Sequence, residues 1–217
     1  MRWALSMVVL AGCATGVPMD TRSELSARWA RVLTEPLARE SGHSVYVRYA
    51  LLGPVPFEAA TINAKRMREA RWVLGSLLPL ALAQADDEGL TDLGAELARA
   101  PLRSEAEIPR VHAALWREVD AHIASGLSAQ AYQTVLYRTS ARPPARNELA
   151  FVALEAVACW LDETFREPLK RSRGSSPSAE TASLGPTSVA YLAVAAGAEP
   201  TEVRNAVIAF LEDLPRR

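Results

Sequence analysis

The chain has 217 residues, of which 49% are hydrophobic and 23% charged, and its formal net charge at pH 7 is −1. This composition is typical of a globular protein and excludes a disordered or collagen-like chain. Because 24 basic residues balance 25 acidic ones, no net positive charge attracts the chain to nucleic acid, and we expect no nucleic-acid partner.

The first thirteen residues have the pattern of a secretory signal. A single arginine, Arg2, precedes an apolar run from Trp3 to Leu10, and small residues follow the run. In such signals the positive charge stays on the cytoplasmic side, the apolar stretch enters the membrane, and the small residues form the cleavage site. The apolar run is too short for a stable transmembrane helix.

The end of this segment, Leu10-Ala11-Gly12-Cys13, resembles the lipobox of bacterial lipoproteins. The resemblance implies a signal peptide over residues 1–12, cleavage between Gly12 and Cys13, and lipid on the Cys13 sulfur and the new amino terminus. It also implies a lipid-anchored protein of the bacterial cell envelope whose membrane contact is the covalent lipid. In the enteric form of the sorting rule that this resemblance implies, Ala14 in place of Asp directly after the cysteine favours the outer membrane over the inner one.

The second cysteine, Cys159, bears on how the fold is stabilised. If lipid occupies Cys13, Cys159 has no intramolecular partner, and a packed core must then supply the stability. Two alternatives stay open at this stage. The first residues can form a buried helix that begins at Trp3, and an unmodified Cys13 can pair with Cys159 in a disulfide.

After a short tether over residues 13–20, apolar residues at helical spacing predict a helical domain over 21–170. The expected helices cover 21–40, 57–85 with a kink or break at Pro79, 91–100, 104–125 and 147–170. Ser104 and Glu107 have the spacing of a capping box. The run from Asn147 to Lys170 is apolar over so wide a face that we expect a central helix.

Two stretches have enough β-branched and aromatic residues to form a minor two-stranded hairpin, residues 44–50 and 132–139. Residues 171–186 are rich in Ser, Gly and Pro and predict a linker or mobile loop. A C-terminal pair of helices, 187–197 and 200–214, then docks on the main domain. The predicted fold class is mainly α, either a compact bundle of helices or a short helical-repeat stack.

The regular spacing of four tryptophans raises the possibility of an internal structural repeat. Trp29, Trp72, Trp116 and Trp160 are 43, 44 and 44 residues apart, a period found in paired-helix repeats. The segments between them do not match, since the first contains the strand-like stretch. The preferred interpretation is four helices that each place a tryptophan in one shared core.

The sequence offers little catalytic chemistry. His112 and His122 lie in the apolar stripe of the 104–125 helix, but ten residues separate them by about 15 Å, too far to share one metal ion. Glu118 and His122 are four residues apart and provide two ligands, with no third placed by the sequence. The acidic stretch 86–89 lacks key oxygen ligands of a calcium loop and favours a solvated turn. We therefore expect no catalytic residue, metal site or cofactor.

These observations predict a lipid-anchored, non-enzymatic envelope protein whose helical surface binds another protein. One alternative is an envelope enzyme or delivered effector with a pocket that includes His112, Glu118 or His122. Another is an immunity-type lipoprotein that neutralises a toxin, which the sequence does not distinguish from other protein-binding roles.

Overall fold

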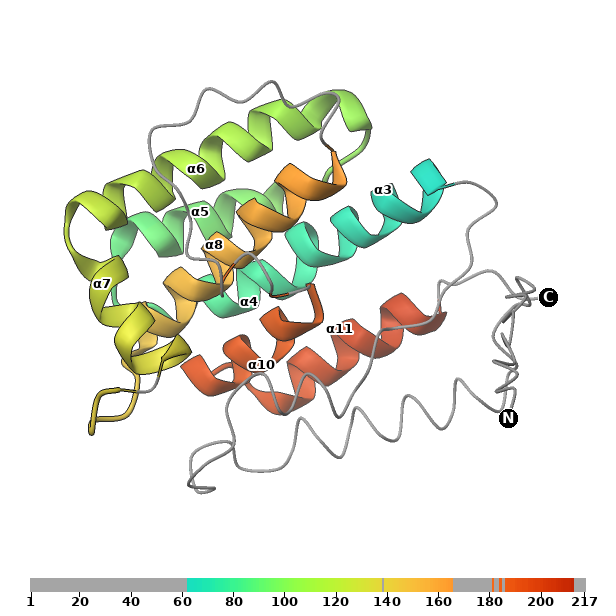
Figure 1. The fold of residues 1–217 in the computed structure, drawn as a ribbon. Coiled ribbons are helices and arrows are strands. Elements are labelled where there is room, and N and C mark those ends of the chain that lie inside the picture. Colours follow the sequence, from blue (N-terminus) through green and yellow to red (C-terminus); the bar gives the residue numbers. More distant parts are fainter. Residues whose placement is uncertain (1–61, 138, 166–180, 182–183, 185, 213–217) are drawn as a thin grey trace, which may run out of the picture.

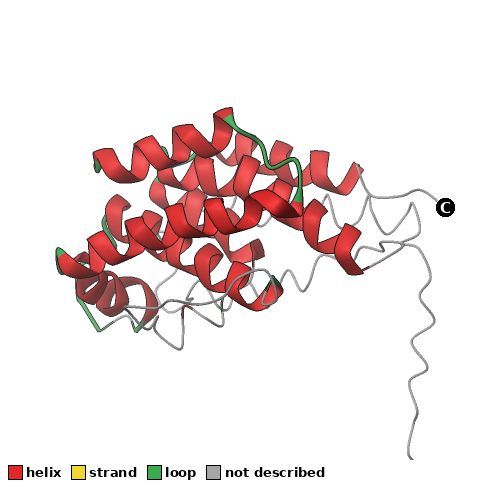
Figure 2. Ribbon diagram, turned by 90° about the horizontal axis from the view of Figure 1, so that it is seen from above, coloured by secondary structure: helices red, strands yellow, loops and turns green. Residues whose placement is uncertain are grey.

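The computed structural model describes residues 62–137, 139–165, 181, 184 and 186–212 (Figure 1). All regular elements among these residues are helical (Figure 2), which confirms the prediction of a mainly α bundle. The predicted signal peptide, the tether, the 21–40 helix and the 44–50 strand lie outside the described residues. None of the helices in the described part is long and apolar enough to cross a membrane.

Eleven helical segments follow one another along the described chain. In order, they are α3 (Ile62–Trp72), η1 (Val73–Leu77), α4 (Leu78–Leu82), α5 (Glu88–Arg99), η2 (Glu105–Glu107), α6 (Ile108–Ala124), α7 (Leu127–Ala131), η3 (Tyr132–Leu136), α8 (Arg146–Thr164), α10 (Pro186–Ala196) and α11 (Pro200–Glu212). The segments η1 and η3 are π-helical, and η2 is a single 3₁₀ turn.

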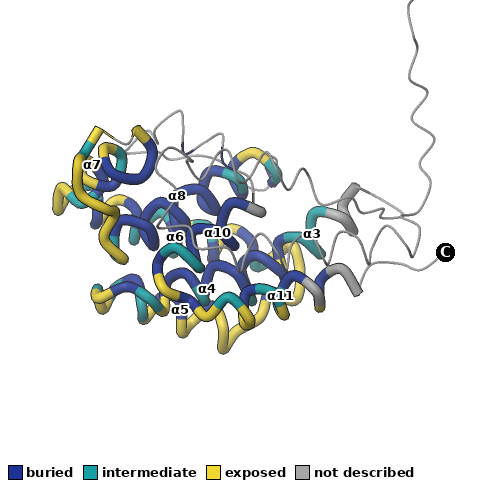
Figure 3. Tube along the Cα trace, turned by 90° about the horizontal axis from the view of Figure 1, so that it is seen from below, coloured by how far each residue is buried: buried dark blue, intermediate teal, exposed yellow. Residues whose placement is uncertain are grey.

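Helix α8 lies at the centre of the bundle, where it contacts α4, α6, α7 and α10. Every residue from Glu148 to Cys159 is buried, as the apolar sequence of this run predicts. In Figure 3, the buried parts of α8 and α10 lie inside, and the exposed residues lie on the outer turns of the surrounding helices, among them α5 and α7. The core is thus built around α8, and the other helices shield it from water.

The predicted break at Pro79 takes the form of a wider helical turn. Helices α3, η1 and α4 follow one another without a gap, and the Leu78 N–H bonds the Val73 carbonyl instead of the residue four back. A proline donates no hydrogen bond, and its ring collides with the carbonyl four residues earlier in a regular α-helix. The π-helical turn accommodates Pro79 while the chain continues in the same direction.

The strand left open for 132–139 does not form over residues 132–136, because residues 127–136 are helical. Gly126 has a φ of +84°, which ends α6 and lets α7 start directly after it. Tertiary contacts then outweigh the β propensity of the segment. The Thr134 hydroxyl donates to the Gln130 carbonyl at 2.9 Å, and the Tyr132 hydroxyl reaches α8.

The ends of three helices differ from what the sequence predicts. Helix α5 begins at Glu88 rather than Thr91, because the Asp87 carboxylate caps it by accepting the Leu90 N–H at 3.1 Å. Ser104 makes no side-chain cap, so the expected capping box is absent at this helix start. Helix α8 ends at Thr164, whereas the prediction continued it to residue 170.

The C-terminal helices are part of the same core. Helix α10 contacts α8 and α4. Trp72 stacks on Phe210 of α11 with ring centroids 4.1 Å apart, and its indole N–H donates to the Ala206 carbonyl at 3.1 Å. Within the predicted linker 171–186, the two residues described before α10, Thr181 and Leu184, are buried.

The three described tryptophans have unlike surroundings. Trp72 is buried against α11, Trp116 is half-buried beside His112, and Trp160 meets Phe165 edge to face. All three pack against one hydrophobic core, while Trp29 lies outside the described residues. Their spacing of about 44 residues therefore does not mark equivalent structural positions.

Two helical glycines give opposite predictions for substitution by alanine. A Cβ on Gly94 would lie 2.9 Å from Cβ of Leu82, which is fully buried, so Gly94 allows α4 and α5 to approach closely. Gly75 has open space around the corresponding position. We expect Gly94→Ala to lower the free energy of unfolding by about 1–3 kcal/mol through overpacking. Gly75→Ala should leave it unchanged or raise it by up to about 1 kcal/mol.

Urea denaturation followed by circular dichroism compares the two variants. Equal effects of the two substitutions would contradict the close approach of α4 and α5 at Gly94.

Candidate functional site

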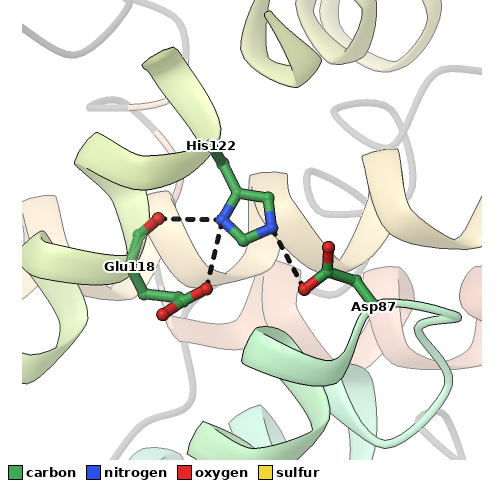
Figure 4. A group of neighbouring side chains, drawn as sticks. All are labelled: Asp87, Glu118 and His122. Carbon is green, nitrogen blue, oxygen red and sulfur yellow. Dashed lines mark hydrogen bonds and ion pairs between the residues drawn. The ribbon is translucent and has the colours of Figure 1, made fainter. Parts of the chain in front are cut away.

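Three polar side chains meet where α5 begins and α6 ends (Figure 4). The His122 ring lies between two carboxylates, with Nε2 3.3 Å from Asp87 Oδ1 and Nδ1 3.3 Å from Glu118 Oε1. One potential metal-ligand atom from each residue lies within 4.8 Å of the other two. His122 is buried, and both carboxylates are partly buried.

The local helix geometry builds this cluster. Glu118 and His122 are one turn apart on α6 and therefore share a face. Asp87 is fixed as the N-cap of α5. Gly89, in the first turn of α5, leaves room for the carboxylate from α6: an added Cβ would lie 2.4 Å from Glu118 Oε1. The two helices can thus bring their carboxylates together above this glycine.

A backbone hydrogen bond orients the His122 ring. Its Nδ1 is 2.8 Å from the Glu118 carbonyl oxygen, which can only accept, so we infer that Nδ1 carries a hydrogen and donates it. Phe151 of α8 packs beside the ring at a centroid distance of 6.0 Å. The ring is therefore held so that Nε2 faces Asp87.

His112 does not join this cluster. Its Nε2 lies 2.9 Å from Asp162 Oδ1 of α8, and its ring meets Trp116 edge to face. Of the three residues considered for an enzyme pocket, the structure brings Glu118 and His122 together and places His112 in another environment. Asp87 is the third member of the cluster, and nothing in the sequence connects it with the histidines.

A second polar feature lies on the central helix, where three acids are buried at intervals of seven residues: Glu148, Glu155 and Asp162. Positions seven apart share a helix face, so these carboxylates form one line along α8. Each is hydrogen-bonded to another element, because an uncompensated charge is costly in a core. Sequence reasoning missed this line, although its seven-residue spacing within an apolar run is a visible signal.

Glu148 has the largest set of partners. It accepts hydrogen bonds from Arg142, from the Thr134 hydroxyl at 2.8 Å and from the Ala145 N–H at 2.8 Å. Burial by itself raises the pKa of Glu148, but these donors, Arg142 above all, outweigh burial and lower it. The same ion pair raises the pKa of Arg142. Glu148 thus holds the 137–145 loop and η3 against α8.

Glu155 and Asp162 connect α8 to the neighbouring segments. The Tyr132 hydroxyl of η3 donates to Glu155 Oε1 at 2.8 Å. Burial, followed by the charge of Glu155, raises the pKa of Tyr132, which keeps the phenol protonated as a donor. Cys159 is also buried on α8, and Cys13 lies outside the described residues.

Comparisons with known proteins provide no identification. No protein-family model matches the chain, and no match is found among curated proteins or solved structures. Function is therefore inferred from the residues of this chain alone.

The Glu148 contacts predict a pH-dependent loss of stability. Because the folded-state pKa of Glu148 is lowered, its contribution is present above the unfolded-state pKa of about 4.5 and is lost as pH falls through the lower folded value. At pH 7, Glu148→Gln should reduce the free energy of unfolding by about 1–3 kcal/mol, since buried donors lose a charged acceptor. Urea denaturation should show this difference becoming smaller as the pH falls below the unfolded-state pKa of about 4.5.

Glu163→Gln is the matched control, because Glu163 is exposed on the same helix. A Glu148→Gln effect that stays constant between pH 7 and pH 3 would contradict the assigned role of the carboxylate charge.

Proposed function

We propose that this chain is a lipid-anchored protein of the bacterial cell envelope that acts by binding another protein rather than by catalysis. The lipobox Leu10-Ala11-Gly12-Cys13 is the observation that carries the location. If lipid is attached at Cys13, the short predicted tether, 13–20, extends no more than about 25 Å and keeps the helical domain near the membrane surface. The favoured site is the outer membrane, because Ala14 follows the cysteine.

The use of the buried polar groups supports a non-catalytic role. The carboxylates of Glu148, Glu155 and Asp162 contact Arg142, Tyr132 and His112 from other segments. Each contact connects α8 to a neighbouring segment and gives a buried carboxylate a hydrogen-bond partner. The buried acids of the central helix therefore have a structural role, because each fixes a neighbouring segment against α8.

Tyr137 supports a protein partner. Tyr137 is the exposed large hydrophobic residue among those that the structure describes, with 48% of its surface accessible to solvent. It begins the loop between η3 and α8, which projects from the body of the bundle (Figure 1). Arg142 in the same loop is half-exposed. Tyrosine and arginine are enriched at the energetically important positions of protein interfaces.

An immunity-type lipoprotein is a narrower form of this proposal, because it also acts by binding a protein. The enzyme alternative has one specific observation in its favour, the meeting of Glu118 and His122 with Asp87. His112 is engaged with Asp162 instead. An enzyme of this type would therefore rely on Asp87, Glu118 and His122 without His112.

Replacement of the lipidated cysteine tests the location. We expect Cys13→Ser to move the protein from the membrane fraction to the soluble fraction and to abolish its labelling with radioactive palmitate, because the thioether cannot form. Cys159→Ala is the control and should remain membrane-bound and labelled. Unchanged labelling and detergent partitioning of Cys13→Ser would contradict the lipoprotein assignment.

Site-specific cross-linking tests the partner. A photoreactive phenylalanine analogue at position 137 should give one discrete envelope-protein adduct in living cells, since Tyr137 is exposed on the projecting loop. The same analogue at Asp120, exposed on α6, is the control and should give no such adduct. The absence of an adduct at 137, or the same adduct from both positions, would count against a binding surface at this loop.

A further inference from the structure

We propose that Asp87, Glu118 and His122 form a binding site for a divalent transition-metal ion, with zinc as the ion that fits best. The sequence alone does not lead to this site, because it places only Glu118 and His122 together. The site is independent of the proposed lipid anchor and of the protein-binding loop. It adds a ligand to the protein without assigning a reaction to it.

The spacing of the ligand atoms fits a tetrahedral ion. Zinc binds histidine nitrogen and carboxylate oxygen at about 2.0–2.2 Å, and two ligands at a tetrahedral angle are then about 3.3–3.5 Å apart. Nε2 of His122 and Oδ1 of Asp87 are 3.3 Å apart. The Glu118 carboxylate lies beside the other ring nitrogen, with Oε1 3.3 Å from Nδ1, although one ligand atom from each of the three residues lies within 4.8 Å of the other two. Glu118 therefore becomes the third ligand when its side chain rotates toward Nε2.

The hydrogen inferred on Nδ1 leaves the other ring nitrogen, Nε2, free to act as a ligand atom that faces Asp87. When Nδ1–H donates to the Glu118 carbonyl, Nε2 of the neutral ring carries a lone pair. That lone pair faces Asp87 Oδ1, another acceptor, across 3.3 Å. Two acceptors at this distance repel each other unless a proton or a metal ion lies between them. A backbone bond to the remote ring nitrogen is also the usual way to orient a metal-binding histidine.

The charge of the cluster suits a divalent cation. Asp87 and Glu118 together carry two negative charges beside a buried ring. A divalent ion bound to neutral imidazole balances both carboxylates, which matters because charge is costly where water is partly excluded.

The neighbouring residues place the two carboxylates beside His122 before an ion binds. The Leu90 N–H holds Asp87 at 3.1 Å, and Gly89 provides the space that the Glu118 carboxylate occupies. Asp87 is partly exposed, with 35% of its side chain accessible, so the ion can enter from solvent and keep a water ligand. One imidazole with two carboxylates suits zinc better than calcium or magnesium, which prefer oxygen ligands throughout.

Isothermal titration of the full chain in detergent, stripped of metal with a chelator, tests the site with ZnCl₂ and separately with MgCl₂. We expect one zinc per chain and much weaker binding of magnesium. Asp87→Asn and His122→Gln should each weaken zinc binding at least tenfold. Asp87→Asn is the decisive variant, because asparagine also caps helices and the start of α5 is kept.

Asp92→Asn is the matched control, since Asp92 is exposed on the same helix, and it should leave zinc affinity unchanged. Circular dichroism melts show whether each variant is folded. Saturable zinc binding that survives Asp87→Asn would place the ion elsewhere and overturn the proposal. The absence of saturable binding to the wild-type chain would also overturn it and would leave a protonated His122 between the two carboxylates as the explanation of the geometry.

Discussion

The burial of α8 on every side between Glu148 and Cys159 is the constraint on which the rest of the structure depends. A carboxylate in a stretch of helix with no face toward water is costly unless neighbouring groups donate hydrogen bonds to it or carry the opposite charge. Helix α8 nevertheless carries Glu148, Glu155 and Asp162 along one line. Their partners come from three different places, the 137–145 loop, η3 and α6. The position of each of these segments is therefore tied to α8 by a specific contact.

These contacts also select one packing arrangement over others. Apolar side chains on α8 can re-form contacts after a shift by one helical turn, because hydrophobic attraction has no direction. The three carboxylates cannot, since each would lose its donor in a water-poor core at a cost of about 1–3 kcal/mol or more. We infer that the line of acids contributes more to the uniqueness of the bundle than to its total stability, a role known for buried polar groups in some proteins.

The sequence predicts the helices well and the polar contacts poorly, for a physical reason. Helical spacing of apolar residues is a local property, so α6, α8, α10 and α11 are visible in it. The helical state of residues 132–136 depends on contacts with α8 that local propensity does not contain. Asp87 joins His122 only because α5 packs on α6, and the two residues are 35 positions apart.

The stacking of Trp72 on Phe210 has a consequence for how the domain folds. It joins the first described helix to the last, and the indole hydrogen bond to Ala206 closes a loop of 134 residues. In a repeat protein each unit contacts only its neighbours, and folding can spread from any point along the chain. Here a helix at one end of the described chain packs against the helix at the other end, so we expect the described helices to unfold as a single cooperative unit rather than as a series of separable modules.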